Sequence, residues 1–357
     1  MDQKMTICYF GLSKPRLARD LVYLKGLKAK GVEVLECVDS SKHFFKYCKL
    51  IAKHSHLKGK YDVIFIGYLS NLIVPLAKLI SSKKIVYNAL CSQYESVILD
   101  RKEHEPFSLA AWYFWLVDFM AFKAADLILV ESEEQKQFLV RFFKAKAEKF
   151  QVVFTGADES LFYPDAGIKK FEDFTVIFRG YFLPATGVKY IIESAKILEP
   201  ENIKFLLIGR GTFTPLIRQQ IFDLQLNNVE LITEFLSDDD LRNKMLASHI
   251  CLGQFSDHQR LSRTIQNKTF EALALKLPYV TADSASNREL LTDRINCLFT
   301  KPADSADLAN KIMFLKNDPV LQERLVENGY DLYQQKLNSM ALGNQVLNLI
   351  LELINKR

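Results

Sequence analysis

Short apolar runs alternate with segments of helical period along most of the chain. In the first half, the runs Thr6–Phe10 and Tyr61–Gly67 are each followed by a turn and an amphipathic segment. Regular alternation of strands and helices predicts parallel sheets covered by helices on both faces, which is the doubly wound α/β architecture. The other strands expected here begin near 31 and cover 84–87, 125–131 and 150–154, and the helices cover 17–30, 72–80 and 133–145.

The same alternation restarts in the second half, after a turn-rich segment that begins at Thr155. A chain of 357 residues is long enough to build two hydrophobic cores. We therefore expect two domains, 1–160 and 175–335, joined by a linker at 161–174 and followed by a C-terminal helical segment at 336–357. The strands expected in the second domain cover 175–178, 203–208, 229–232, 249–253 and 278–282, and the helices cover 187–198, 213–226 and 238–247.

The composition is that of an ordinary globular protein, with 49% hydrophobic and 25% charged residues. The six cysteines are scattered without a CxxC pair or metal-ligand spacing, so we expect reduced, buried thiols. The first ten residues run into an apparent strand and show no signal peptide, which favours a cytoplasmic protein. Nothing in the sequence points to nucleic acid as a partner.

Positive charge is concentrated in the first half of the chain. Residues 1–160 hold 24 Lys and Arg against 18 Asp and Glu, whereas the remainder holds 23 against 24. A basic half predicts an anionic partner surface.

A basic amphipathic helix is expected between Lys42 and Lys60. Lysines 42, 46, 49 and 53 share one helix face, and Phe44, Phe45, Cys48, Ile51 and Ala52 lie largely on the other. Such a helix can attach peripherally to an anionic membrane leaflet. The alternative is a helix that packs its apolar side on its own sheet and leaves the lysines in solvent. The sequence does not decide between the two.

The apolar segment 107–122 contains both tryptophans, Trp112 and Trp115. It is too short to span a membrane and includes Asp118, so a transmembrane helix is not expected. We expect a largely buried helix beneath the sheet.

The strongest chemical signal lies between His249 and Leu291. A buried strand there leads to a polar loop and then to a helix with Asn267 at its start and with Lys268 and Glu271 on one face. Backbone N–H groups and the positive dipole end at a helix start suit a phosphate. A second strand and a short helix with Glu289 complete the unit. An ordinary βαβ unit with a solvated charged face is the alternative.

The phrase NKTFEALALKLPYVTADSASNRELL resembles the nucleotide-sugar site of the retaining glycosyltransferases of the GT-B class, family four. The resemblance extends less sharply over nearly the whole chain. It implies two Rossmann-like domains that face each other across a cleft, with the C-terminal helix crossing back to the N-terminal domain. It also implies that Glu271 holds the donor ribose, that the donor is a nucleotide-diphosphate sugar, and that no metal or other cofactor is needed.

Further candidate site residues follow predicted strands, where open α/β sheets bind ligands. On the donor side these are Gly11, Gly180, Gly209, Arg210, Gly211 and Arg260, and on the acceptor side they are Arg16, Arg19, Glu95, Asp100 and Arg101. Solvated arginines and salt-bridged loop charges are the alternative for the acceptor side.

The sequence departs from the family pattern at three positions. Tyr181 and Thr186 stand where the family has an Arg and a Lys, and Arg263 stands where it has a Glu. A donor diphosphate still needs countercharge, so we expect the charge to have moved to the loop Arg260–Lys268, with Arg263 and Lys268 in catalytic roles. Asp257 is the nearest carboxylate that could replace the missing Glu. A degenerate, inactive site is the competing interpretation.

The resemblance implies a retaining transfer to an acceptor hydroxyl, in the assembly of a glycolipid, a polysaccharide or another cell-surface glycan. The basic first half favours a lipid-linked or other glycan acceptor at an anionic membrane. Two alternatives stay open: a nucleotide-sugar epimerase on the same scaffold, and a catalytically inactive partner protein. No Ser-His-Asp pattern and no phosphate-loop signature are present.

Overall fold

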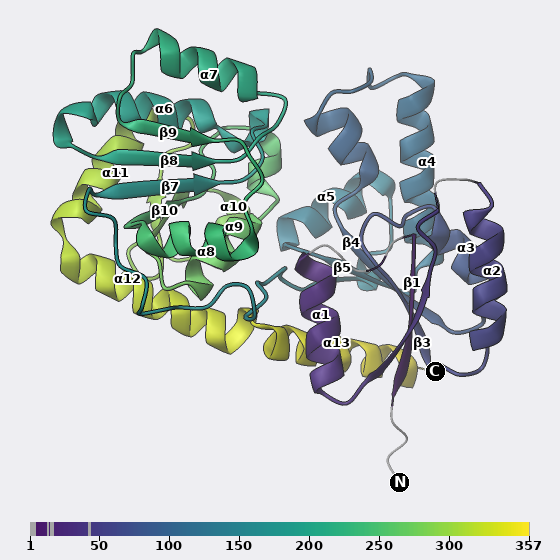
Figure 1. Ribbon diagram of the computed structural model, residues 1–357. Coiled ribbons are helices and arrows are strands. Elements are labelled where there is room, and N and C mark those ends of the chain that lie inside the picture. Colours follow the sequence, from purple (N-terminus) through teal and green to yellow (C-terminus); the bar gives the residue numbers. More distant parts are fainter. Residues whose placement is uncertain (1–4, 13, 15–17, 42–43, 357) are drawn as a thin grey trace. The chain divides into compact units, whose positions relative to one another are not determined.

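The computed structural model describes residues 5–12, 14, 18–41 and 44–356. The chain forms two compact units (Figure 1), and they are described separately. The first unit comprises Met1–Gly156 and Asn338–Arg357, and the second comprises Ala157–Leu337. The segment 161–174, expected to be a linker, therefore belongs to the second unit.

The first unit is built on a six-stranded sheet of order β2-β1-β3-β4-β5-β6, in which all pairings are parallel. Residues in the central strands are apolar on both faces, as a parallel sheet covered on both sides requires. The strands are β1 (Thr6–Gly11), β2 (Glu33–Val38), β3 (Val63–Ile66), β4 (Lys84–Leu90), β5 (Leu127–Val130) and β6 (Phe150–Val152).

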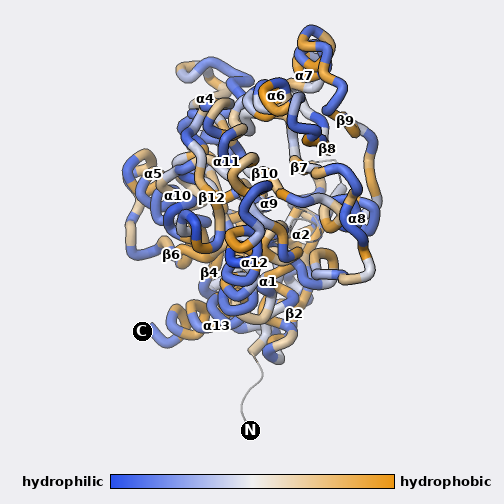
Figure 2. Tube along the Cα trace, turned by 90° about the vertical axis from the view of Figure 1, so that its left-hand side faces the viewer, coloured by the Kyte–Doolittle hydropathy of each residue, from blue (hydrophilic) through white to orange (hydrophobic). Residues whose placement is uncertain are grey.

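Two hydrophobic clusters cover the two faces of this sheet. One cluster takes side chains from α2 (Lys46–Leu57), α3 (Ile73–Ile80), α4 (Leu109–Ala124) and α5 (Glu133–Phe143). The other takes side chains from α1 (Ala18–Ala29) and α13 (Ser339–Asn355). Hydrophobic and hydrophilic positions alternate along α13 (Figure 2), and its buried residues pack against α1. The C-terminal helix, which the resemblance placed on the N-terminal domain, is thus part of the first unit.

The close approach of α1 and α13 depends on glycine. A Cβ on Gly26 would lie 1.8 Å from the carbonyl oxygen of Ser339, and a Cβ on Gly343 would lie 2.5 Å from Cα of Gly26. Larger residues at either position would separate the two helices and open the cluster between them.

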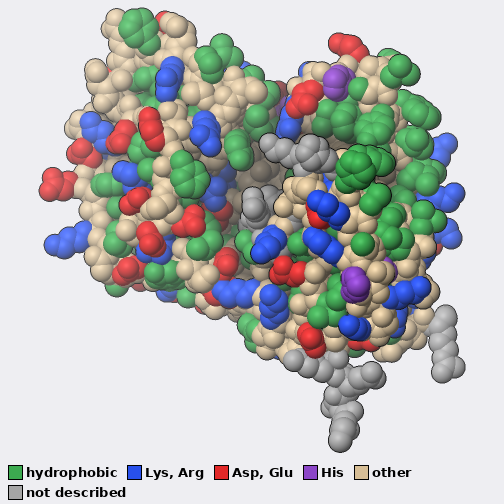
Figure 3. Space-filling view, turned by 45° about the vertical axis from the view of Figure 1, so that its right-hand side comes forward, with side chains coloured by type: hydrophobic (Ala, Val, Ile, Leu, Met, Phe, Trp, Pro, Cys, Tyr) green, Lys and Arg blue, Asp and Glu red, His purple; other side chains and the backbone are tan. Residues whose placement is uncertain are grey.

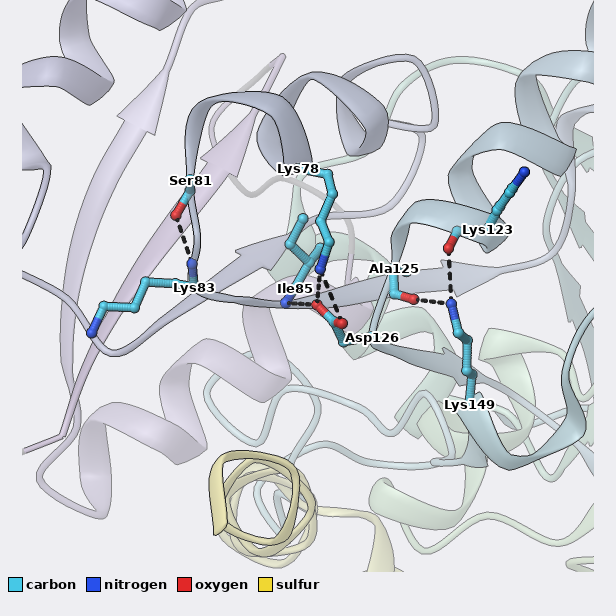
Figure 4. Close-up of polar contacts among 8 residues, drawn as sticks. All are labelled: Lys78, Ser81, Lys83, Ile85, Lys123, Ala125, Asp126 and Lys149. Carbon is cyan, nitrogen blue, oxygen red and sulfur yellow. Dashed lines mark hydrogen bonds and ion pairs between the residues drawn. The ribbon is translucent and has the colours of Figure 1, made fainter. Parts of the chain in front are cut away.

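Polar contacts fix the amino ends of β4 and β5 (Figure 4). Asp126 accepts hydrogen bonds from the backbone N–H of Ile85 at 2.9 Å and from Nζ of Lys78 at 3.0 Å. Lys149 donates to the carbonyl oxygens of Lys123 and Ala125, at 2.8 and 2.7 Å. Charged side chains therefore hold the backbone at the amino ends of these two strands.

The second unit contains another six-stranded parallel sheet, of order β12-β11-β10-β7-β8-β9. A hydrophobic cluster joins its strands to the helices α6, α7, α11 and α12. The strands are β7 (Thr175–Arg179), β8 (Lys204–Ile208), β9 (Val229–Ile232), β10 (Ile250–Leu252), β11 (Tyr279–Ala282) and β12 (Leu298–Thr300). The helices are α6 (Val188–Ile197), α7 (Thr214–Asp223), α8 (Asp238–Ala247), α9 (Asn267–Ala274), α10 (Ala285–Arg288), α11 (Ser305–Asn317) and α12 (Pro319–Leu332).

The prediction of two doubly wound α/β domains is confirmed, whereas the cleft expected between them stays a prediction. One expectation about an individual helix is wrong. Helix α4 is not largely buried, because Leu109, Trp112 and Tyr113 are exposed at its start. Helix α2 buries Leu50 and His54 and exposes Ile51, one of the residues placed on its apolar side. No described helix is both long and hydrophobic enough to span a membrane.

Candidate functional site

The candidate site lies where the strand order of the second sheet changes direction. Strand β7 is the first strand of this unit, and the chain places β8 on one side of it and β10 on the other. In open parallel sheets, ligands bind at the carboxyl ends of the strands at such a switch point. Here β7 ends at Arg179, which is followed by Gly180, and β10 ends at Leu252, which is followed by Gly253.

Helix α9 brings the predicted pair of side chains to this point. Its residues are almost all buried, so Lys268 and Glu271 point into the unit instead of forming a solvated face. The Arg179 guanidinium donates a hydrogen bond through Nη2 to Oε1 of Glu271 and forms an ion pair with it. The interpretation as an ordinary solvated helix is therefore wrong.

The carboxylate of Glu271 is only 3% exposed. Burial raises the pKa of Glu271, and the Arg179 guanidinium counteracts part of that rise. Oε2 of Glu271 is buried and has no hydrogen-bond partner among the described residues. The pair thus leaves one carboxylate oxygen able to accept a hydrogen bond.

Lys268 is a buried cation without a carboxylate in direct contact. Its Nζ lies 3.9 Å from the centre of the Phe178 ring and forms no hydrogen bond with any described residue. Burial, and secondarily the nearby Arg179 guanidinium, lowers the pKa of Lys268 to about 7. An anion that reached this amine would favour its charged form.

Two glycines let the backbone come close to these side chains. A Cβ on Gly180 would lie 3.1 Å from Nζ of Lys268, and a Cβ on Gly209 would lie 1.8 Å from the carbonyl oxygen of Gly180. Both have positive φ angles, 146° and 156°. Only glycine fits both the backbone conformation and the space.

A cavity of about 230 Å³ opens beside Gly180. Arg179 belongs both to its wall and to the ion pair with Glu271. The aromatic rings of Tyr181 and Phe235 are exposed there, at 72% and 83%. Its lining comprises Arg179, Gly180, Tyr181, Ile208, Gly209, Arg210, Thr233, Glu234, Phe235, Leu236 and Leu241.

Of the lining residues, only Gly180, Gly209 and Arg210 were predicted from the sequence; Arg179 and the aromatic walls Tyr181 and Phe235 were not. The signal for Arg179 is a single cation at the end of an apolar strand, directly before a glycine. The family pattern has its two cations at positions 181 and 186, so it does not single out the residue before the glycine.

The remaining donor-side candidates do not line this cavity. Arg260 lies in the short helical turn η5 (Gln259–Ser262), and Arg263 ends that turn; both are partly exposed. Asp257, Asn267 and Glu289 are exposed. Gly211 packs against Phe182, whose carbonyl oxygen would be 2.4 Å from an added Cβ. Of the loop expected to hold the displaced charge, the structure brings only Lys268 to Gly180.

The acceptor-side candidates in the first unit are mostly structural. Arg19 is 2% exposed and donates to Oδ1 of Asn88 at 2.6 Å. Glu95 is buried and accepts from Nε2 of Gln135 at 2.7 Å. Asp100 is buried at the end of the π-helix Glu95–Asp100, and Arg101 forms an ion pair with Glu103 at 3.4 Å. Gly11, a donor-side candidate in the same unit, is the last residue of β1.

The basic face of α2 is only partly available to a partner. Lys53 donates to Oδ2 of Asp39 at 3.1 Å and to the carbonyl oxygen of Val38 at 2.7 Å. Lys46 lies over the Tyr47 ring at 5.3 Å, and Lys49 is exposed. Lys42 and Arg16 lie outside the described residues.

Within the described part of the chain, no group of His, Cys, Asp and Glu side chains is arranged to hold a metal ion. The site consists of two cations, one carboxylate and an aromatic-walled cavity.

Comparison with known proteins finds a family whose model matches most of this unit. Residues 163–332 match the model of the family "Glycosyl transferases group 1". The second unit carries a glycosyltransferase group 1 domain. The chain is also 24% identical over 317 residues to alpha-D-kanosaminyltransferase of Streptomyces kanamyceticus, an alignment covering 84% of this chain and 77% of that protein.

Solved glycosyltransferase structures resemble the whole chain. HepE of Anabaena in complex with UDP-glucose has a TM-score of 0.74 at 18% identity and covers 98% of this chain and 100% of its own. Sucrose-phosphate synthase of Thermosynechococcus elongatus has a TM-score of 0.76 at 17% identity, with 99% and 100% covered. These likenesses show that the group 1 domain is part of a GT-B fold.

Proposed function

We propose that the chain is a retaining glycosyltransferase that moves a sugar from a nucleotide-diphosphate sugar to an acceptor hydroxyl. The observation that carries the proposal is the cluster of Arg179, Lys268 and Glu271 beside Gly180, at the switch point of a group 1 domain. This cluster offers countercharge to a diphosphate and a carboxylate oxygen to a sugar hydroxyl in one buried place.

Each part of the donor has a counterpart in the site. The exposed rings of Tyr181 and Phe235 suit a flat nucleotide base, since aromatic side chains stack on bases. Oε2 of Glu271 can accept a hydrogen bond from a ribose hydroxyl, and Nζ of Lys268 can donate to a phosphate oxygen. Buried polar groups without protein partners are rare, and a polar ligand explains them.

These residues promote the transfer by electrostatic stabilisation of the leaving group. As the bond from the sugar to the diphosphate breaks, negative charge grows on the leaving phosphate and positive charge on the sugar ring. Arg179 and Lys268 are held in place by Glu271 and Phe178, so they stabilise the leaving group without reorganising. We expect transfer without a divalent metal, because two side-chain cations face the phosphates.

The missing family cations are replaced differently from the sequence-based hypothesis. We propose that Arg179, one residue before the glycine, and Lys268 take the roles of the absent Arg and Lys. Arg260, Arg263 and Asp257 are then secondary candidates that contact the donor sugar through the loop after β10.

The acceptor is proposed to be a lipid-linked sugar or another growing glycan. The support is the excess of positive charge in residues 1–160 and the exposed Lys49 on α2. Attachment to an anionic leaflet would bring the chain to such an acceptor.

The test begins with the donor. UDP-sugars come first, because HepE has been solved with UDP and UDP-glucose, followed by GDP- and ADP-sugars. A ligand that binds the folded state raises the melting temperature. The stabilising donor is then incubated with glycan and lipid-linked acceptors in the presence of a chelator, and proton NMR of the product reads the anomeric configuration.

The proposal is supported if the anomeric configuration of the sugar is retained and the donor is consumed only when acceptor is present. Inversion of the anomeric configuration would contradict it. Two alternatives make different predictions. An epimerase would convert the donor without any acceptor, and an inactive partner would bind donor without turnover. The comparisons with known proteins favour neither alternative.

A further inference from the structure

Large hydrophobic side chains are exposed at the starts of three helices of the first unit. Globular proteins rarely leave several such side chains exposed together without a partner. Their exposed fractions run from 41% for Leu72 to 101% for Phe107. This set, here called the apolar edge, comprises Phe44 and Phe45 before α2, Leu69 and Leu72 before α3, and Phe107, Leu109, Trp112 and Tyr113 at the start of α4.

The topology of the sheet brings these residues together. Helices α2 and α3 follow the parallel strands β2 and β3, and α4 follows β4 after the π-helix Glu95–Asp100, so the chain reaches the start of each helix from the carboxyl edge of the sheet. Side chains of all three helices join one hydrophobic cluster on the same face of the sheet, and α3 packs directly against α4. Figure 3 shows hydrophobic side chains gathered over one part of the surface of the first unit.

Basic residues accompany the apolar edge. Lys46 and Lys49 lie on the first turn of α2, close in sequence to Phe44 and Phe45, and Lys102 precedes Phe107. Lys49 and Lys102 are exposed. Arg101 adds little, because Glu103 forms an ion pair with it at 3.4 Å. The edge therefore combines protruding aromatic and aliphatic groups with a modest positive charge.

We propose that the apolar edge inserts into the headgroup region of an anionic lipid leaflet. Aromatic side chains flanked by lysines are typical of surfaces that lie at a membrane interface, where rings enter the acyl boundary and ammonium groups stay with the phosphates. A lipid surface also fits side chains that protrude from three separate helix ends. The inference deepens the proposed lipid-linked acceptor, and its test measures binding alone, so that either proposal can fail without the other.

Insertion differs measurably from attachment through the basic face of α2. Lysines alone would hold the protein in the headgroup layer and release it in salt, and they would leave Trp112 in water. Insertion of the apolar edge moves Trp112, which is 63% exposed, into a less polar surrounding.

Trp112 serves as the reporter. Trp115, the other tryptophan, stacks on Phe119 at 5.1 Å and on Phe143. The Trp115→Phe variant therefore keeps an aromatic ring there and leaves Trp112 as the single tryptophan. Vesicles of phosphatidylcholine with phosphatidylglycerol are added to this variant. We expect a blue shift of the emission and quenching by brominated acyl chains, part of which persists at high salt. Unchanged emission at saturating lipid overturns the proposal.

Serine variants locate the surface. Phe107→Ser with Leu109→Ser, and separately Phe44→Ser with Phe45→Ser, should each weaken vesicle partitioning by about tenfold or more. The matched control is Leu79→Ser with Phe222→Ser: these side chains are 84% and 77% exposed but lie outside the apolar edge. An equal loss in the control contradicts the assignment.

The melting temperature without ligand, measured on every variant, verifies folding. If vesicles do not bind but wild type self-associates in light scattering and the edge variants do not, the edge is a protein interface and the lipid proposal is wrong.

Discussion

Replacing Lys268 by methionine should make the protein more stable and bind its donor less well. Methionine has nearly the length of the lysine stem and keeps the contact with the Phe178 ring. It removes an amine that is buried without a hydrogen-bond partner among the described residues. A residue retained for packing would behave oppositely, because its loss would lower stability and leave binding unchanged.

The size of the gain follows from the pKa of Lys268, which burial lowers from 10.5 to about 7. Below pH 10.5 the unfolded chain takes up this proton more readily than the folded chain, so the free energy of unfolding is reduced. Linkage gives a reduction of about 4 kcal/mol at pH 7.5 and about 1 kcal/mol at pH 9.5. Lys268→Met abolishes this cost, so its advantage should shrink as the pH rises.

Binding should change in the opposite direction. A charge-assisted hydrogen bond to a phosphate is worth about 1.5–3 kcal/mol, which corresponds to about 10- to 150-fold in affinity. The assay pairs urea unfolding at pH 7.5 and 9.5 with calorimetric titration of the nucleotide diphosphate that most raises the melting temperature. Lys276→Met is the control and should change neither affinity nor the pH dependence, because this partly exposed lysine just beyond the same helix pairs with Glu327 at 3.1 Å.

Two results would refute the reasoning. A Lys268→Met variant that is less stable at pH 7.5 and binds nucleotide normally would make Lys268 a structural cation. A gain in stability that is equal at both pH values would show that its ionisation is not the cause.

The ion pair and its neighbours give further expectations. Arg179→Met leaves the buried Glu271 carboxylate without its cation and should lower the free energy of unfolding by about 3–5 kcal/mol. Urea unfolding should show a smaller loss at low pH, where the carboxyl group is protonated. Glu271→Gln should weaken nucleotide diphosphate binding yet strengthen pyrophosphate binding in the same titration, because the ribose contact is lost while the cations remain; parallel changes would remove Glu271 from the ribose. Arg263→Glu should lower turnover in the transfer assay. A rise in turnover would show that Arg263 impairs a degenerate site. Nucleotide binding at pH 8 should take up about one proton in wild type and none in Lys268→Met, as titrations in two phosphate-free buffers of different ionisation enthalpy would reveal.

Much of the fold could be predicted because its strands are buried on both faces. Val63–Ile66 and Leu127–Val130 are continuous apolar runs, and such runs separated by helical segments specify a parallel sheet. The faces of the helices were harder to predict. In α2 the pattern placed Ile51 on the apolar side, whereas the structure exposes Ile51 and buries Leu50 and His54. Nε2 of His54 forms a hydrogen bond with the Tyr61 hydroxyl at 2.5 Å. Periodicity predicts a helix, but the neighbouring elements decide which face they cover.

The site could be predicted only where it is local in sequence. Lys268 and Glu271 are three residues apart on one helix, so their shared face follows from helix geometry. Arg179 is 92 residues from Glu271, and their contact exists because β7 pairs with β10. A pairing of strands so distant in sequence is a property of the sheet, and no spacing within the loop could reveal it.

The side chains of the site bury little net charge when no ligand is bound. Arg179 is balanced by Glu271, and the lowered pKa of Lys268 leaves much of its amine neutral near pH 7, so little net charge is buried. An anion that reaches Lys268 shifts its amine towards the charged form. A diphosphate therefore strengthens the positive charge of the site on binding, whereas a neutral sugar does not. This difference favours a charged donor over the many uncharged sugars that share its hydroxyl groups.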